Sequence, residues 1–255
     1  MKKRNGFTVS EVIITLFLIG VIAMMTIPSV VSDYRKKIYS TSLATAVAGL
    51  NSAMTTMIEK EHVNNLLETR AWQDILGTDK VTYHLTGGDN GNSDNFVREI
   101  SKNIIVTRQE ESGEAYRRFG NSENADDNEF RLADDDIVVR SKKGIDYIFR
   151  ININSGTHEV KNEVEALREG FNYTENAGEV YIDVNGVNNG PNITGRDFFV
   201  FDLGADGRLY PYGGGDYNYY HDDNLCRNDE LRVECGKDAR CCSSYMMEFG
   251  YNMDY

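Results

Sequence analysis

The chain opens with an apolar segment that is too long for an ordinary buried helix. It runs from Phe7 to Val31, and its only charged side chain is Glu11. An α-helix rises about 1.5 Å per residue, so a run of about twenty-five residues covers the ~30 Å hydrocarbon layer of a bilayer. A carboxylate inside that layer is costly and is by default a functional residue with a partner. The segment therefore predicts a membrane-spanning helix in which Glu11 has a role.

The residues around the segment exclude a conventional secretory signal. Such a signal has an apolar stretch of about 7–15 residues and a small-x-small cleavage site after it. This run is longer, and the stretch "TIPSVVSDYRKK" that follows offers no such site. A plain membrane anchor fits the length but leaves Glu11 unexplained. Basic residues stand on both sides of the run, so charge alone does not settle its orientation: Lys2, Lys3 and Arg4 before it, and Arg35, Lys36 and Lys37 after it.

Four marks of the N-terminal segment fall in the register of a known family. The stretch "NGFTVSE", the apolar helix and the later "TIP" resemble the class III leader and first helix of type IV prepilins and of type II secretion pseudopilins. The marks are Gly6, then Phe7, then Glu11 as the fifth residue counted from Phe7, and Pro28 as the twenty-second. The resemblance implies that a prepilin peptidase cleaves between Gly6 and Phe7 and methylates the new Phe7 amine.

Within this family, cleavage gives Glu11 a partner. The new α-amine of Phe7 is as unfavourable in lipid as the carboxylate, and staggered helices bring the amine of one subunit to Glu11 of its neighbour. Removing one member of a buried pair is strongly destabilising because the other charge is left alone. Glu11 is thus expected to set the register between subunits, with Thr8 helping to place the amine. Pro28 is expected to kink or loosen the helix, or to mark its end at the membrane exit.

An amphipathic stretch follows the apolar segment. From residue 32 to residue 60, apolar side chains recur at spacings of three and four, which predicts one buried helix face: Leu43, Val47, Leu50, Met54 and Ile58. The stretch resembles the second half of the first helix of pilins, which packs on the sheet of the globular head. Met54 and Met57 are interpreted as core residues.

The rest of the chain carries one further helix signal and then strand signals. A helix is predicted over Asp94–Ile105, with Phe96, Ile100 and Ile104 on one face. Strands are predicted over 145–153, 180–184 and 197–203, and a turn over 204–207. One long helix followed by strands indicates an α+β fold, and the resemblance to pilins implies the pilin fold, with a C-terminal disulfide-bonded region. The expected parts are a cleaved leader (1–6), a membrane-spanning helix (7–31), its amphipathic continuation (32–60) and an extracytoplasmic head with insertions (61–255).

All four cysteines lie in the last thirty or so residues: Cys226, Cys235, Cys241 and Cys242. Beyond a membrane-directed segment, such clustering predicts local disulfides in an oxidising compartment. Of the three possible connectivities, a bridge between the adjacent Cys241 and Cys242 is disfavoured by strain. Zinc is the weaker interpretation, because the sequence has no C-x-x-C and His221 is the only nearby histidine. Free thiols are the remaining alternative.

The stretch "DVNGVNNGPNITGRDFFVFDL" resembles a recurrent block of pilin-like proteins. Asp183, Asn185 and Asn188 place oxygens near a glycine, and the resemblance to pseudopilins makes calcium conceivable there. The EF-hand loop with its closing Glu is absent. Since Asp and Asn beside Gly are first of all turn residues, turns are the favoured interpretation and no cofactor is expected.

Net charge and the absence of catalytic motifs argue against two classes of function, nucleic-acid binding and catalysis. A formal net charge of −13 argues against nucleic acid, which requires a basic face. Enzymatic activity is not expected, because no catalytic triad spacing, P-loop or metal motif is present. The four histidines stand in unrelated contexts: His62, His84, His158 and His221.

The expected function is that of a structural subunit of a type IV pilus or related filament. Its expected partners are the prepilin peptidase, other pilin subunits, and indirectly the inner-membrane assembly platform and its cytoplasmic ATPase. The expected location is the inner membrane, with the N-terminus in the cytoplasm and the head outside, and afterwards a cell-surface or periplasmic filament. A type II secretion pseudopilin is the closest alternative. A membrane-tethered adhesin or carbohydrate-binding module is the alternative from another class.

Overall fold

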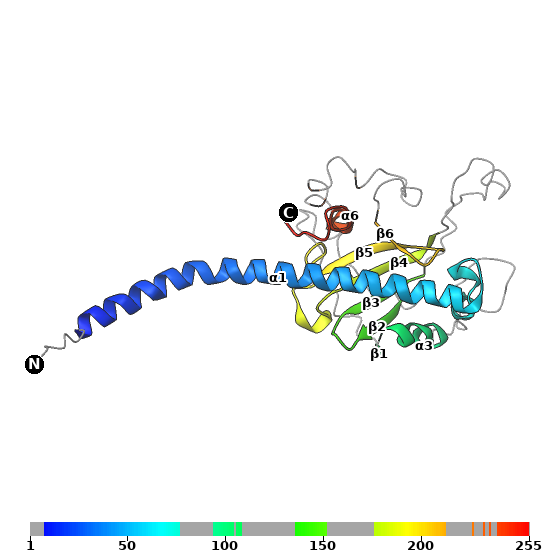
Figure 1. Cartoon of the computed structure of the whole chain (residues 1–255), viewed down its shortest axis with the longest axis horizontal. Helices are drawn as coiled ribbons and strands as arrows, with labels where there is room; N and C mark the ends of the chain where they lie inside the picture. Colours follow the sequence, from blue (N-terminus) through cyan, green and yellow to red (C-terminus); the bar gives the residue numbers. More distant parts are fainter. Residues whose placement is uncertain are drawn as a thin grey trace, which may run out of the picture. The chain divides into compact units, whose positions relative to one another are not determined.

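A six-stranded antiparallel sheet forms the centre of the head, and its strands follow one another in chain order (Figure 1). Neighbouring strands pair throughout, so the sheet is a simple meander in which every connection joins adjacent strands. The strands are β1 (Val106–Arg108), β2 (Ile137–Ser141), β3 (Asp146–Arg150), β4 (Asn176–Asp183), β5 (Phe198–Gly204) and β6 (Leu209–Pro211).

The computed structural model describes residues 8–76, 94–104, 106–108, 136–151, 176–212, 226, 232, 235 and 239–254. These residues fall into two compact units, divided between Ile38 and Tyr39. The first unit consists of the apolar N-terminal part of helix α1. The second contains the rest of α1 together with the sheet and the shorter helices, and it forms the head.

Helix α1 (Val9–Glu61) is a single helix of 53 residues. Alanines, leucines and methionines favour helix over its second half, and the helix stops just before His62, which has a positive φ of 55°. The predicted apolar stripe is confirmed: Leu43, Val47, Leu50 and Met54 are buried, and Ile58 is partly buried. Met57 is also a core residue, as interpreted from the sequence.

The second half of α1 packs on one face of the sheet (Figure 1). Tyr147 and Phe149 of β3 point to this face, flanked by Ile145 and Ile151, and alternate residues of the other strands join them. The predicted shared face of 145–153 is therefore confirmed as far as residue 151, while Ile153 lies outside the described residues. A smaller cluster occupies the opposite face: Ile148, Tyr181, Val187, Phe198, Val200 and Tyr212.

Three short elements close one end of the core: η1 (Leu66–Glu68), α2 (Arg70–Leu76) and α3 (Asp94–Asn103). Trp72 of α2 meets Phe96 of α3 edge to face at 5.5 Å between ring centroids, and Phe96 meets Phe149 of β3 in the same way at 5.0 Å. Edge-to-face pairs are a favoured aromatic arrangement, so α2 and α3 are attached to the sheet through this stack. Among the described residues, η4 (Ala239–Cys241) and α6 (Cys242–Glu248) follow the sheet, while η2 (Val187–Asn189) lies between β4 and β5.

The predicted fold class is confirmed: the fold is α+β and pilin-like, with a long N-terminal helix, an antiparallel sheet and C-terminal disulfides. The helix predicted over Asp94–Ile105 is present but ends at Asn103. Strands β1 and β2 were not predicted. Strand β1 has only three residues, and the sequence of β2, IVVRS, does not alternate between apolar and polar residues. Pairing defines both strands: β1 pairs with β2, and β2 pairs with β3.

Candidate functional site

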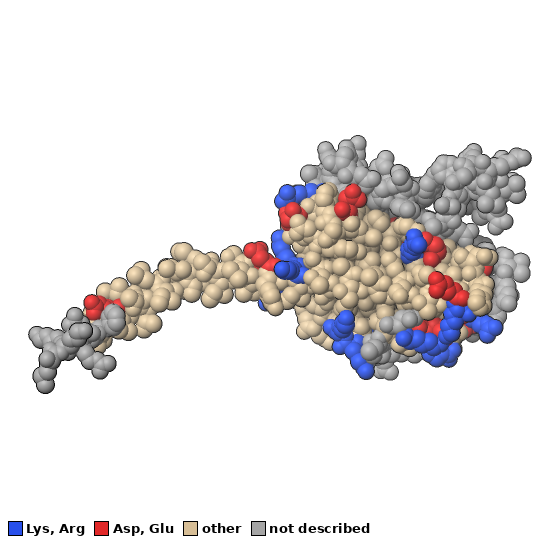
Figure 2. Space-filling view, in the orientation of Figure 1, with Lys and Arg blue, Asp and Glu red and all other residues tan. Residues whose placement is uncertain are grey.

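The first part of α1 presents an apolar surface, in which Glu11 is the one charged residue up to Val31. Its large apolar side chains from Val9 to Val31 are mostly more than half exposed, with Phe17 at 70% and Met24 at 78%. No residue in its most apolar eighteen-residue window is buried within the protein. By length and composition α1 is the one helix, among the described residues, able to cross a membrane. Figure 2 shows this part as almost uncharged, with acidic atoms near its start. A surface of this kind requires lipid or other apolar chains to cover it.

Glu11 forms a capping box with Thr8 at the start of α1. The backbone N–H and the hydroxyl of Thr8 both donate to Glu11 Oε2, each at 2.8 Å, and the Glu11 N–H donates to Thr8 Oγ1 at 3.3 Å. This arrangement satisfies N–H groups that an α-helix leaves unpaired at its N-terminus. Glu11 therefore has a partner in its own chain, which the sequence argument missed. The Thr-x-x-Glu spacing of "TVSE" was the signal that pointed to it.

The capping box uses one oxygen of the carboxylate only. Both Thr8 donors bind Oε2, so Oε1 has no partner among the described residues. An ionised carboxylate accepts hydrogen bonds at both oxygens. The N-terminus of α1 thus holds Glu11 in a fixed position and leaves one acceptor available. Gly6 and Phe7, the predicted cleavage residues, lie outside the described residues.

Pro28 lies inside α1, which continues on both sides of it. The alternative that the helix ends at this residue is therefore wrong. Proline has no N–H to donate to the carbonyl four residues earlier, so one backbone hydrogen bond is missing from this turn.

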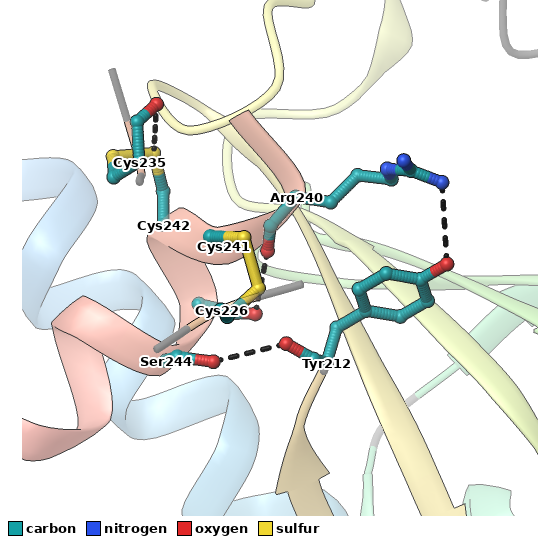
Figure 3. Close-up of a disulfide and its surroundings, with 8 residues drawn as sticks. Tyr212, Cys226, Cys235, Arg240, Cys241, Cys242 and Ser244 are labelled. Atoms are coloured by element: carbon teal, nitrogen blue, oxygen red, sulfur yellow. Dashed lines mark hydrogen bonds between the residues drawn. A yellow bond between two sulfur atoms is a disulfide. The ribbon is translucent and has the colours of Figure 1, made fainter. Parts of the chain in front are cut away.

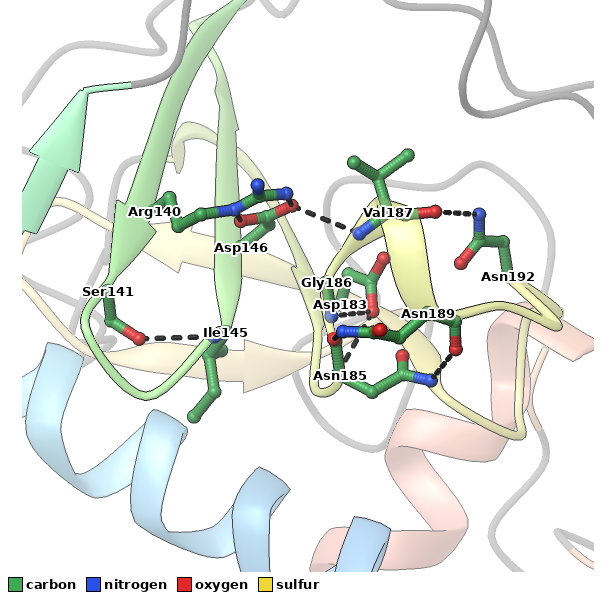
Figure 4. A network of polar contacts seen from close by, with 10 residues as sticks. All are labelled: Arg140, Ser141, Ile145, Asp146, Asp183, Asn185, Gly186, Val187, Asn189 and Asn192. Atoms are coloured by element: carbon green, nitrogen blue, oxygen red, sulfur yellow. Dashed lines mark hydrogen bonds and ion pairs between the residues drawn. The ribbon is translucent and has the colours of Figure 1, made fainter.

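The loop between β4 and β5 collects two buried acids at one end of the sheet. Asp183, the last residue of β4, and Asp197, just before β5, are both fully buried. Asp183 Oδ1 accepts the N–H groups of Asn185 and Gly186, at 3.2 and 2.9 Å (Figure 4). Asp197 accepts the N–H groups of Asn192 and Ile193 at 3.0 and 2.7 Å. The favoured interpretation of this stretch as turns agrees with these contacts.

Asp146 on β3, a neighbour of these two acids, differs from them because it has a cationic partner. Arg140 of β2 binds Asp146 through both of its carboxylate oxygens, at 2.6 and 2.5 Å, and the N–H of Val187 adds a third contact (Figure 4). Burial, together with the like charges of Asp197 and Asp146, raises the pKa of Asp183 to about 7, against the lowering effect of its hydrogen bonds with the N–H groups of Asn185 and Gly186. Burial also raises the pKa of Asp197, against the lowering effect of its hydrogen bonds with Ile193 and Asn192.

The structure brings together two of the three residues considered for calcium. Asp183 and Asn185 lie beside each other in the loop, whereas the side chain of Asn188 is exposed. The sequence argument missed Asp197, which folding of the loop returns to the neighbourhood of Asp183. Among the described residues, no three His, Cys, Asp or Glu side chains gather as metal ligands. Any metal in this loop would therefore need amide, hydroxyl or carbonyl oxygens besides the two carboxylates.

The cysteines form two interleaved disulfides, Cys226–Cys241 and Cys235–Cys242, with Cα atoms 5.3 and 4.6 Å apart (Figure 3). The prediction of disulfides is confirmed, and the zinc and free-thiol alternatives are wrong. The adjacent pair Cys241 and Cys242 links η4 and α6 to two different chain segments. Contacts with Tyr212, which follows β6, attach the same region to the sheet: Arg240 donates to its hydroxyl at 3.2 Å and Ser244 to its carbonyl at 3.0 Å.

Of the four histidines, only His62 lies among the described residues, at the end of α1. Fold and site together define a class: an α+β head whose long helix extends into an exposed apolar segment with one capped carboxylate. Comparisons of the chain with protein-family models, curated proteins and solved structures found no match.

Proposed function

We propose that this protein is a structural subunit of a type IV pilus or related filament, assembled through the apolar half of α1. The single observation that carries the proposal is the exposed apolar helix with Glu11 held near its start. Such a surface is covered by lipid in a lone subunit and by neighbouring helices in a filament. No enzymatic role is proposed.

The position of Glu11 supports a pairing role. Oε2 is held by Thr8, and Oε1 remains available to a partner. In the proposed assembly the partner is the α-amine of Phe7 from the adjacent subunit, created when the prepilin peptidase removes residues 1–6. In a low-dielectric bundle of helices, an ammonium and a carboxylate each satisfy the charge of the other. Their contact fixes the stagger between subunits.

The proposed route follows from this pairing. The chain enters the inner membrane with its N-terminus in the cytoplasm and its head outside, is cleaved and methylated at Phe7, and joins a filament. An assembly platform and its cytoplasmic ATPase, which this chain does not encode, supply the force. A pseudopilin of type II secretion would assemble through the same pairing.

Two substitutions at one position separate the charge of Glu11 from its capping contact. Glu11→Gln keeps a side-chain oxygen for the Thr8 N–H but removes the charge, since Gln also serves in capping boxes. Glu11→Ala removes both. We expect both variants to insert in the membrane, and both to yield filaments at a level at least about tenfold below wild type. Thr8→Val, which removes only the hydroxyl, should reduce assembly less.

The measurement is the amount of subunit in sheared and sedimented filaments, with carbonate extraction to verify membrane insertion. Mass spectrometry of the mature chain should find methylated Phe7 at its N-terminus in wild type and variants alike. Normal filament yield from Glu11→Gln would refute charge pairing. Immunogold label spread over the envelope, rather than along fibres, would favour the membrane-tethered adhesin or carbohydrate-binding module.

A further inference from the structure

The apolar segment of α1 is followed by a cluster of basic residues that the proposed function does not use. Exposed apolar side chains continue to Val31, and a polar stretch comes next. It contains three consecutive basic residues, here called the basic collar: Arg35, Lys36 and Lys37. Residues 32–38 hold these three cations and one acid, Asp33, so their formal net charge is +2. Arg35 and Lys37 are exposed, and Lys36 is partly buried.

The length of the apolar segment puts the collar at the surface of a bilayer. At about 1.5 Å per residue, α1 rises about 34 Å from Val9 to Val31, close to the ~30 Å thickness of the hydrocarbon layer. When this segment spans the layer, the next helical turn lies among the lipid headgroups. Tyr34 in that turn is 65% exposed, and tyrosine is enriched at this depth because its ring is apolar and its hydroxyl is polar. The first buried residue of α1 is Tyr39, so the collar comes before the part of the helix that packs in the head.

The collar presents positive charge to more than one side of the helix. An α-helix has 3.6 residues per turn, so three consecutive residues project around more than half of its circumference. A guanidinium binds phosphate oxygens in pairs, and an ammonium binds them as a point charge. Each Lys or Arg close to an anionic membrane surface strengthens the attraction by about fivefold. A zwitterionic headgroup carries a cation of its own beside the phosphate and therefore attracts the collar less.

We propose that the basic collar binds the phosphate groups of anionic phospholipids, such as phosphatidylglycerol, at the C-terminal end of the membrane-spanning segment. The inference rests on the membrane insertion in the proposed function and adds the class of lipid that this end of the segment recognises. The other occupant to consider is an acidic surface on a second copy of this chain, whose formal net charge is −13. Lipid is favoured because the collar directly follows a segment of bilayer length and stands beside the exposed Tyr34, two features that a protein partner does not require.

The test places a fluorescent reporter beside the collar. Tyr34→Trp is introduced into the full chain, which is reconstituted in vesicles of phosphatidylcholine and phosphatidylglycerol, one of the two with brominated acyl chains. Bromine quenches tryptophan only at short range, so the quenched fraction reports which lipid contacts residue 34. The same measurement on the chain that keeps Tyr34 gives the background from Trp72, the only other tryptophan. The basic residues before Phe7 precede the opposite end of the segment, so they do not contribute to this reading.

We expect phosphatidylglycerol to bind beside the intact collar at least about fivefold more strongly than phosphatidylcholine at about 0.05 M salt. Replacing all three collar residues by glutamine should bring this ratio to about 1. Raising the salt to about 1 M should also lower the ratio, because the Debye length falls to about 3 Å. The collar is not part of the head core, so the variant is expected to fold.

A matched control removes one arginine and two lysines that are exposed in the head. Its substitutions are Arg70→Gln, Lys142→Gln and Lys143→Gln. This control should keep the lipid preference of the intact collar, because the same charge is removed from outside the collar.

A ratio of about 1 with the intact collar, or an unchanged ratio after the collar is neutralised, would overturn the proposal. Absence of quenching by either lipid would show that residue 34 does not reach the bilayer, and would count against the proposed membrane insertion as well. A collar variant that loses cross-linked dimers in phosphatidylcholine vesicles, without any lipid preference in the intact chain, would assign the collar to a second copy instead. None of these readouts depends on filament formation, so charge pairing at Glu11 is tested separately.

Discussion

Leucine side chains are buried in the second half of α1 and exposed in the first half, and the same substitution in each half can test this difference. Leu43 is fully buried between α1 and the sheet, whereas Leu16 is 62% exposed in the apolar half. Replacing each by alanine removes the same atoms. Only at Leu43 do these atoms contact the head core, so only Leu43→Ala leaves a cavity there.

The expected cost of Leu43→Ala follows from its burial. Leu→Ala substitutions at fully buried sites cost about 3–5 kcal/mol, the larger values belonging to sites that cannot collapse around the cavity. Leu43 lies between a helix and a six-stranded sheet, both stiff, so a cost at the upper end, about 4–5 kcal/mol, is expected. In a domain of this size each kcal/mol lowers the unfolding midpoint by about 2–4 °C, so the midpoint should fall by about 8–20 °C. Leu50→Ala, also fully buried, should behave alike.

Trp72 provides the assay. It is the only tryptophan of the chain and is fully buried against Phe96, so its fluorescence reports unfolding of the head alone. Measured in detergent micelles, Leu16→Ala should leave the Trp72 transition within about 1 °C of wild type, because its side chain is exposed and is not part of the head core. Equal shifts from Leu43→Ala and Leu16→Ala, or no shift from Leu43→Ala, would refute the division of α1 into a core half and an exposed half.

Three further predictions concern the head. Gly207→Ala should lower the free energy of urea unfolding by about 2–3 kcal/mol, because Gly207 has a φ of 78° and a new Cβ would lie 3.0 Å from Met54 Cβ. Gly144→Ala, at a φ of 80° with open space around it, should lower it by only about 1 kcal/mol. Equal costs would contradict the contact with Met54. Replacing Cys226 and Cys241 together by serine should lower the unfolding free energy by about 3 kcal/mol, from the fifteen-residue separation that the bridge spans, and an unchanged midpoint of chemical denaturation would contradict this. Burial raises the pKa of Tyr147 to about 12, above the unfolded value of about 10, so the stability from its neutral hydroxyl is complete below pH 10 and is lost as pH rises through 12. Between pH 8 and pH 11, the unfolding free energy of Tyr147→Phe should therefore fall by about 1 kcal/mol less than that of wild type. Equal losses from the two proteins in urea titrations would refute this prediction.

Long periodic segments made much of the fold predictable. The stripe from Leu43 to Ile58 and the alternation from Ile145 to Ile151 each repeat often enough to specify an element and its buried face. Short elements lacked this redundancy. Strand β1 has three residues, so its pairing with β2, and not its own sequence, decides that it is a strand.

The residues of the candidate site that could be predicted were those with a signal in the local sequence. Glu11 stood out because a charge inside an apolar run is conspicuous, and its partner Thr8 is only three residues away. Asp183 and Asn185 were noticed beside a glycine. Asp197 was not, because nothing in the local pattern shows that the loop returns it to Asp183.

The sequence by itself determined the apolar N-terminal helix, the face of its continuation that is buried and the presence of disulfides, since each depends on residues close together in the chain. Only the tertiary structure decided which cysteines pair, and that two unpaired carboxylates share one buried corner. The physical reason is distance along the chain. Helical and strand periodicity act over a few residues, whereas pairing of charges and thiols depends on where folding brings distant segments together.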